Sequence, residues 1–178
     1  MSARFWNSLA VAALFSSLSA AHETPDPCSL ISAAEIEEIQ GEKVKSTKGS
    51  APERSLLAVS QCFYTLPTFS RSVSVELTLK GPSRDESQSP SRQWKTLFHS
   101  RTRAKQDDAA RPVPGVGDEA FWSGNAYVGA LYVLKSDAYL RISIGGAGDE
   151  AARIDRSKRL AEKALARLSS LQSERSGS

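Results

Sequence analysis

The sequence predicts an α+β domain in which helices pack on an antiparallel or mixed sheet. Three features indicate this class: a capping box that starts a helix near residue 32, a strictly alternating strand over 72–80, and a long amphipathic helix over 149–171. Helices and strands do not alternate one by one, as they do in a doubly wound parallel sheet. The order of elements also fits a two-fold pseudo-repeat of a helix-plus-hairpin unit, although the halves share no sequence identity.

The first helix is predicted to begin at Ser32, whose hydroxyl can accept the amide of Glu35 while the Glu35 side chain reaches back. Gly41 supplies a left-handed end. The next elements are a brief strand, a Gly/Ser/Pro loop, a strand and the alternating strand, over 43–46, 47–54, 61–65 and 72–80. A polar stretch over 81–90 then separates the two halves.

A second helix is expected to begin at Ser91 and to fray by Asp107, with Trp94, Leu97, Phe98 and Arg101 on one side. A stiff turn over 112–117 leads to a strand at 120–122 and a hairpin turn at 123–125. The strand at 127–134 is apolar on both faces, which favours an interior place in the sheet. After a turn, a last strand at 139–144 precedes the long helix, and 172–178 reads as a disordered tail.

The N-terminal 21 residues have the features of a secretory signal peptide. Arg4 precedes an apolar stretch from Leu9 to Leu18, and the small residues before His22 suit cleavage after Ala21. About ten apolar residues are too few to cross a bilayer, which requires roughly twenty. We therefore expect a periplasmic or secreted protein, with one domain over 22–171 and no transmembrane segment in the mature chain.

Net charge and cysteine content limit the classes of function that the sequence supports. The 178 residues carry a formal net charge of only +3, which argues against a dedicated nucleic-acid binder. In an oxidising compartment the two cysteines, Cys28 and Cys62, are most simply a disulfide. The alternatives are lipid modification of Cys28, although residues 24–27 lack a small apolar box, and metal binding, for which two Cys and two His are too few.

No catalytic set, metal site or cofactor motif is assembled in the sequence. His22 and His99 are far apart, and no G-x-S-x-G elbow is present. Adjacent Asp118 and Glu119 would point to opposite faces of a strand, so Asp118 is expected to bond turn amides, with a ligand-site acid as the alternative. The glycines over 145–148 are expected to be a strand-to-helix connector; a phosphate cradle is the alternative.

Two groups of side chains are candidates for ligand or partner binding. Basic residues around Trp94 on the second helix could hold an anionic envelope component, unless Trp94 is buried. The aromatic residues Trp122, Tyr127, Tyr132 and Tyr139 would wall an apolar pocket if two or three of them lined one sheet face; the favoured alternative is that they are core. The candidate site residues are Trp94, Arg101, Asp118, Trp122, Tyr127 and Tyr132; the basic group is Arg92, Lys95, Arg101, Arg103 and Lys105.

Three short motifs resemble a known family. They are Cys28-Ser29-Leu30-Ile31-Ser32 followed by Ala34-Glu35 and Gly41, then Cys62-Phe63-Tyr64, and Gly115-Val116-Gly117-Asp118-Glu119-Ala120-Phe121. Over about residues 27–170 the pattern is similar to small exported bacterial domains of unknown function, many of them actinobacterial lipoproteins, and more distantly to extracellular sensor domains of mycobacterial serine/threonine kinases. The resemblance implies a disulfide-bonded α+β fold and ligand or partner sensing. The chain departs from the family in lacking a lipid-attachment cysteine at the signal junction.

The leading hypothesis is an exported, non-enzymatic domain that binds a small ligand or an envelope partner between its sheet and a helix. One alternative is an envelope hydrolase with carboxylates from distant segments, for instance Glu76 and Asp118. Another is a structural or inhibitory protein that acts through its surface.

Overall fold

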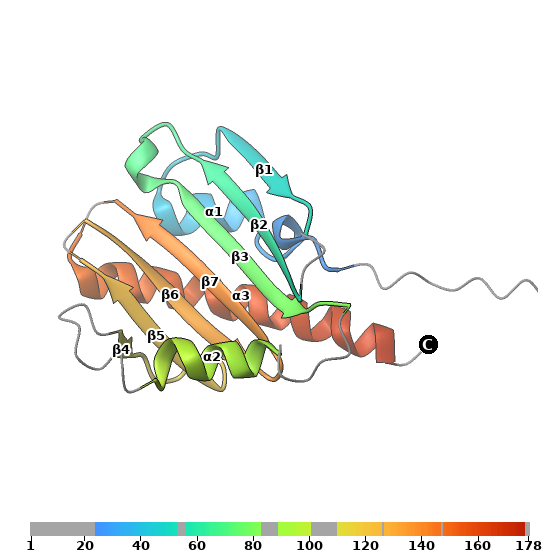
Figure 1. The fold of residues 1–178 in the computed structure, drawn as a ribbon. Coiled ribbons are helices and arrows are strands. Elements are labelled where there is room, and N and C mark those ends of the chain that lie inside the picture. The colour runs from blue at the N-terminus through green and yellow to red at the C-terminus, as the bar shows by residue number, and fades with distance from the viewer. Residues whose placement is uncertain are drawn as a thin grey trace, which may run out of the picture.

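The strands in the described part of the chain form one seven-stranded antiparallel sheet in the order β1-β2-β3-β7-β6-β5-β4 (Figure 1). The computed structural model describes residues 24–52, 56–82, 89–100, 110–125, 127–146 and 148–176. The predicted signal peptide over 1–21 lies outside the described residues. Three helices pack on the sheet, and the α+β prediction is confirmed.

The helices are α1 (Ala33–Gln40), α2 (Pro90–Phe98) and α3 (Glu150–Ser176), and two short 3-10 turns are η1 (Pro27–Ser29) and η2 (Phe69–Arg71). The strands are β1 (Ser46–Ser50), β2 (Leu57–Thr65), β3 (Val73–Lys80), β4 (Arg111–Pro112), β5 (Glu119–Gly124), β6 (Val128–Lys135) and β7 (Ala138–Gly145). None of the described helices is long and apolar enough to cross a membrane.

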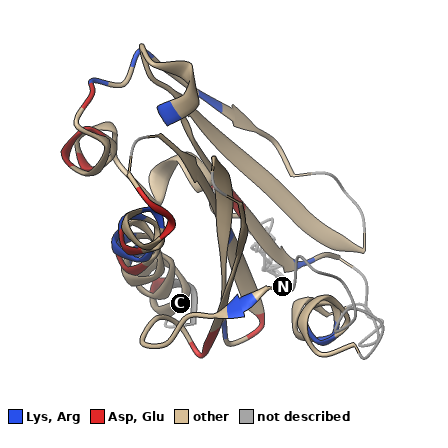
Figure 2. Ribbon diagram, turned by 90° about the vertical axis from the view of Figure 1, so that its left-hand side faces the viewer, with Lys and Arg blue, Asp and Glu red and all other residues tan. Residues whose placement is uncertain are grey.

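The sheet has two differently covered faces. Figure 2 shows α1 and α3 on one side of the sheet, which we call the inner face, and α2 on the other, the outer face. Alternation along β3 sends Val73, Val75 and Leu77 to the inner face, where all three are fully buried. α3 presents one apolar stripe to them, formed by Leu160, Ala161, Ala164 and Leu168.

Both ends of α1 are specified locally, as predicted. The Ser32 hydroxyl accepts from the Glu35 amide at 3.3 Å, and the Glu35 side chain accepts from the Ser32 amide at 2.8 Å. Gly41 ends the helix with a φ of 73°, in the left-handed region that favours glycine.

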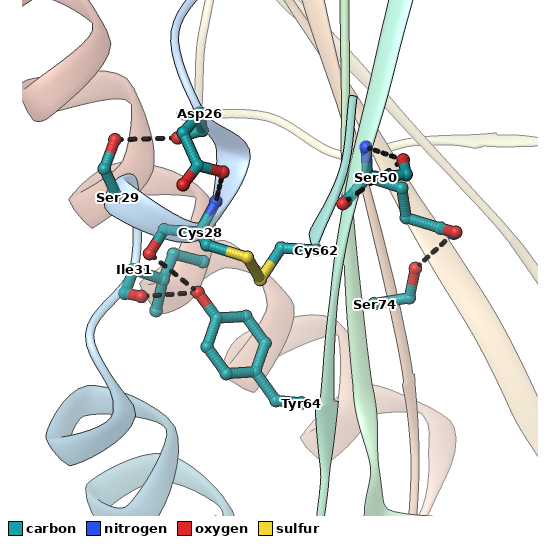
Figure 3. Close-up of a disulfide and its surroundings, with 9 residues drawn as sticks. Asp26, Cys28, Ser29, Ile31, Ser50, Cys62, Tyr64 and Ser74 are labelled. Carbon is teal, nitrogen blue, oxygen red and sulfur yellow. Dashed lines mark hydrogen bonds between the residues drawn. A yellow bond between two sulfur atoms is a disulfide. The ribbon is translucent and has the colours of Figure 1, made fainter. Parts of the chain in front are cut away.

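The predicted disulfide is present and joins η1 to β2 (Figure 3). Next to it, the Tyr64 hydroxyl donates to the carbonyl oxygen of Ile31 at 2.5 Å. Burial raises the pKa of Tyr64 to about 12, so this hydroxyl remains a donor at physiological pH. The disulfide and Tyr64 together fasten the segment before α1 to the sheet.

The first strand differs from the prediction. We expected a brief strand at 43–46 and a loop at 47–54, whereas β1 occupies Ser46–Ser50 and pairs with residues 61–65 of β2. Every residue of β1 is exposed, so no hydrophobic alternation marks it. Backbone pairing with β2 defines this edge strand.

α2 begins two residues earlier than predicted. Ser89 caps it by accepting from the Arg92 amide at 3.3 Å, and Pro90 takes the first helical position. Ser91, the predicted cap, instead donates its hydroxyl to Asp137 at 2.6 Å, which ties the helix to the β6–β7 turn. The helix ends at Phe98, so the described residues do not bear out a helix continuing toward Asp107.

α3 extends through Ser176, beyond the predicted end at Leu171, so residues 172–176 are helical and not a tail. Residues 149–176 contain no Gly or Pro, so no residue of these types ends the helix before Gly177. The predicted interior place of β6 is confirmed, since it lies between β5 and β7.

The pseudo-repeat is present only in the strands. The meanders β1-β2-β3 and β5-β6-β7 meet where β3 pairs with β7. The helices that precede them, α1 and α2, lie on opposite faces of the sheet (Figure 2). The helix-plus-hairpin unit is therefore not repeated as a whole.

Candidate ligand-binding site

α2 covers only part of the outer face of the sheet, and the part that no described helix covers holds an open cavity of about 390 Å³. The sheet strands β2, β3, β5, β6 and β7 contribute to it. The lining residues are Phe63, Ser72, Ser74, Ser123, Gly124, Asn125, Val128, Gly129, Ala130, Tyr132, Arg141, Ser143 and Ile144.

The floor of the cavity is one cross-strand row of small residues. Ser74 of β3 lies opposite Ser143 of β7, Ser143 opposite Ala130 of β6, and Ala130 opposite Ser123 of β5. Side chains of this size leave space above the sheet, where larger ones would fill it. At the β2 end of the row, Phe63 lies opposite Ser74 and supplies an aromatic boundary.

A cluster of aromatic rings attaches α2 to the outer face and closes one side of the cavity. Trp94 is 1% exposed and lies between Phe98, Phe121 and Tyr139, with ring centroids 4.4–6.0 Å away. Phe98 also meets the edge of Tyr132, at 5.2 Å between centroids. Tyr132 is therefore shared between the helix contact and the cavity wall.

Glu119 holds the end of α2 by accepting two hydrogen bonds. Its Oε2 atom accepts from the Trp94 indole, and it lies 3.0 Å from Nε2 of His99, the C-terminal cap of the helix. Burial alone would raise the pKa of Glu119, but the hydrogen bonds from His99 and Trp94 outweigh burial and lower it. The carboxylate is thus ionised at neutral pH and fixed to α2.

Arg141 supplies the charge in the cavity. Its Nε atom donates to the Tyr132 hydroxyl at 3.0 Å, and its guanidinium carbon lies 5.6 Å from the centre of the Tyr132 ring. Glu76 lies directly opposite Arg141 on β3, yet the two form no ion pair among the described residues. The guanidinium is oriented by Tyr132 and keeps further N–H donors that Glu76 does not occupy.

Ser143, on the cavity floor, has a hydroxyl group whose hydrogen bonds are unsatisfied within the described part of the chain. The hydroxyl is buried and has no hydrogen-bond partner among the described residues. The neighbouring Ser74 hydroxyl accepts from Nε2 of the Gln61 side chain at 2.8 Å and so retains its own proton for donation. A buried polar group without a partner is costly, on the order of 1–3 kcal/mol, and a ligand that bonds Ser143 would recover this.

Exposed apolar residues gather at the end of the cavity away from α2. Phe69, Tyr127 and Val128 are 73%, 81% and 58% exposed. Phe69 lies 6.2 Å from Phe63 between ring centroids, and the Asn125 side chain accepts from the amides of Tyr127 and Val128, which fixes that turn. Exposed apolar side chains around a concave site are typical of binding surfaces.

The structure separates the candidate residues chosen from sequence. Tyr132 lines the cavity, and Tyr127 lies in the turn beside it. Trp122 is 1% exposed on the inner face, opposite Leu131, so it belongs to the core, the alternative considered for it from sequence, and it is not a wall of the cavity with Tyr132. Arg101 lies outside the described residues.

Asp118 behaves as the turn residue that we expected. It pairs with Lys135 at 2.7 Å and accepts from the Ser136 amide at 2.7 Å. Both hydrogen bonds lower its pKa. The oxygens of Asp118 are engaged at the β6–β7 turn, and Asp118 is not among the residues that line the cavity.

The other sequence candidates also have structural explanations. Trp94 is buried, so it is not an exposed aromatic among the cations of α2; Arg92 and Lys95 are exposed on that helix. A second cavity, of about 490 Å³, lies along α2. All of its described lining residues fall within 89–100, so among the described residues no other helix or strand forms a wall opposite α2. Asp149 accepts from the Ala152 amide at 2.8 Å, a contact that fits the connector interpretation of the glycines over 145–148.

Sequence reasoning missed Arg141, Ser143 and Phe63. A signal for the first two was available, because Tyr139, Arg141 and Ser143 alternate with apolar residues along one strand. Among the described residues, no group of three His, Cys, Asp or Glu side chains could hold a metal ion. Neither family models nor curated proteins give a match to this chain.

Proposed function

We propose that this protein is an exported, non-enzymatic domain that binds a small ligand in the cavity of the outer face. The observation that carries the proposal is a half-buried arginine, Arg141, which is held by Tyr132 and has no carboxylate partner among the described residues; the nearby Ser143 hydroxyl likewise has no described partner. Exposed apolar residues at the rim add to it. A few converging polar groups in a concave site with apolar walls are typical of small-molecule sites.

A carboxylate hydrolase receives less support. The described residues that line the cavity include neither Asp nor Glu. Of the two acids considered from sequence, Asp118 is bonded to Lys135 and Ser136, and Glu76 does not line the cavity. A glycosidase requires two carboxyl groups facing one bond in the same cleft.

Export is supported by the disulfide, because such bonds persist mainly in oxidising compartments. Intact-mass analysis of protein from its native host tests this part of the proposal. We expect a mass that corresponds to cleavage after Ala21 and to two fewer hydrogens than the dithiol. A mass that includes residues 1–21 would contradict export with cleavage after Ala21, and a lipid adduct on Cys28 would contradict the disulfide.

Binding in the cavity is tested with the neutral fluorescent probe N-phenyl-1-naphthylamine and the oxidised mature protein. We expect saturable binding, and about a 10-fold or greater loss of affinity in Ser123→Phe, which fills the floor of the cavity from β5. Thr47→Phe on the exposed edge strand β1 adds the same side chain elsewhere and should leave affinity unchanged. No saturable binding, or equal loss in both variants, would contradict the proposed site.

A further inference from the structure

We infer that the ligand is a small amphiphilic anion, whose carboxylate or other oxyanion binds Arg141 and Ser143 while its apolar body lies toward Phe63 and the exposed rim. This inference rests on the proposed function, since it assigns a ligand class to the same cavity. Arg141, which belongs to none of the motifs found in the sequence, would position the charged group of the ligand.

Charge favours an anion. Arg141 is the single charged side chain among the described residues that line the cavity. Its cross-strand neighbour Glu76 forms no ion pair with it, so within the described part of the chain no bound carboxylate neutralises the positive charge. A guanidinium offers parallel N–H donors that match the two oxygens of a carboxylate.

Geometry supports one head position. Tyr132 restrains the guanidinium on two counts, through the hydrogen bond at 3.0 Å and the ring contact at 5.6 Å. Ser143 follows Arg141 by two residues on β7, so both side chains lie on the same face, and its hydroxyl lacks a described partner. An oxyanion bound to Arg141 would therefore lie over the face of β7 that also carries Ser143.

The apolar groups define where the rest of the ligand lies. Phe63 lies beyond Ser74 at the far end of the floor, and Val128 lines the cavity while 58% of it is exposed. The polar head and apolar body thus occupy different ends of one site. A volume of about 390 Å³ is at the small end of the range for ligand pockets, which favours a small molecule over a polymer.

Two probes that differ only by a charged group test the inference. 8-Anilino-1-naphthalenesulfonate is N-phenyl-1-naphthylamine with an added sulfonate. We expect the anionic probe to bind wild-type protein about 10-fold or more tightly than the neutral probe, because of charge-assisted hydrogen bonds to Arg141. We also expect increased salt to lower the affinity for the anionic probe and to leave the affinity for the neutral probe unchanged. Equal affinities with no salt dependence would overturn the inference.

Arg141→Gln removes the charge but retains a polar side chain. Affinity for the anionic probe should fall by about 10-fold or more, and by a larger factor than affinity for the neutral probe, which lacks a group for the guanidinium to bind. Arg141→Lys, which keeps the charge without the planar fork, should lie in between. Arg92→Gln removes an exposed cation from α2 outside the cavity and should change neither affinity. If Arg141→Gln does not fold, Arg141→Lys and the salt series decide the question.

The source of the anion is distinguished by displacement of the anionic probe. Displacement by decanoate would indicate an aliphatic acid, and displacement by 1-naphthoate an aromatic acid; displacement by neither would overturn the inference.

Failure of the inference differs from failure of the proposed function. If the neutral probe binds and Ser123→Phe blocks it, but Arg141 has no effect, the cavity is a binding site for neutral ligands. If neither probe binds, the proposed function fails as well.

Discussion

Arg167 of α3 and Glu35 of α1 form a two-pronged ion pair across 132 positions of sequence, with N···O distances of 2.7 and 2.9 Å. Glu35 is also the residue that completes the capping box with Ser32, and Arg167 donates to the carbonyl oxygen of Leu30 at 2.7 Å. One carboxylate therefore fixes the start of α1 and joins it to the C-terminal helix.

This pair predicts a specific dependence of stability on pH. The hydrogen bonds from Arg167, together with those from Ser32, lower the pKa of Glu35 from 4.5 to about 2, against the effect of burial. A lowered carboxyl pKa stabilises the fold fully above the unfolded value of 4.5, and this contribution is lost as pH falls from 4.5 toward 2. We expect Glu35→Gln to lower the free energy of unfolding by about 1–2 kcal/mol at pH 7, because the pair is partly exposed to solvent.

Urea denaturation at several pH values measures this effect. The difference between wild type and Glu35→Gln should shrink below pH 4.5 and be nearly absent near pH 2. Glu38→Gln is the control, since Glu38 pairs with Arg159 at the surface, with 56% of its side chain exposed, and should change stability little. A difference for Glu35→Gln that is the same at both ends of the pH range would contradict this role.

The disulfide should stabilise the fold chiefly through the unfolded chain. It closes a loop with a sequence separation of 34, for which the chain-entropy model gives up to about 4 kcal/mol. We expect the double variant Cys28→Ser, Cys62→Ser to lose about 2–4 kcal/mol in urea denaturation and to remain folded, because the Tyr64 hydrogen bonds persist. Titration of two free thiols in wild-type protein purified from the periplasm without reductant would refute the pairing.

Gly129 allows the Trp122 indole to lie close to the backbone of β6 on the inner face. A Cβ atom at Gly129 would lie 2.0 Å from Cζ2 of Trp122, so a side chain there must displace the indole. We expect Gly129→Ala to lower stability by about 1–3 kcal/mol, as overpacking does, measured by thermal and urea unfolding. Thr47→Ala on exposed β1 should change it by less than about 0.5 kcal/mol. A neutral Gly129→Ala would show that the ring has room to move.

Glu119 is predicted to control the local stability of α2. Because its carboxylate accepts from both Trp94 and His99, Glu119→Gln should weaken the attachment of the helix to the outer face. Hydrogen exchange of the α2 amides should become several-fold faster than in wild type, while exchange in the β3–β7 pair remains unchanged. Glu162→Gln on the exposed side of α3 serves as the control. Uniform acceleration over the whole domain would instead indicate a global loss of stability.

Sequence predicted the elements whose causes are local. The first helix was found because its start and end are encoded within residues 32–41, and β3 because its alternation is uninterrupted. β1 was missed because nothing in its own five residues distinguishes it from a loop; its strand conformation follows from pairing with β2. Trp122 could not be assigned to a face, because Phe121 beside it is also aromatic and either could have faced inward.

The candidate site was less predictable for a related reason. Tyr132 could be chosen as an aromatic residue of a hairpin strand, but Ser74, Ser143, Ala130 and Ser123 are ordinary small residues when read singly. They become a floor only because the register of four strands places them in one row. Arg141 likewise acquires significance from its contact with Tyr132 and from the absence of a described pair with Glu76.

Binding of a small ligand at the outer-face cavity is tested most directly by amide chemical-shift mapping of the oxidised protein during titration with N-phenyl-1-naphthylamine. We predict saturable shifts confined to the strands that line the cavity, centred on Ser143, Ala130 and Tyr132. The inner face around α1 and α3 should remain unchanged. An absence of saturable shifts, or shifts centred on the inner face, would contradict the account.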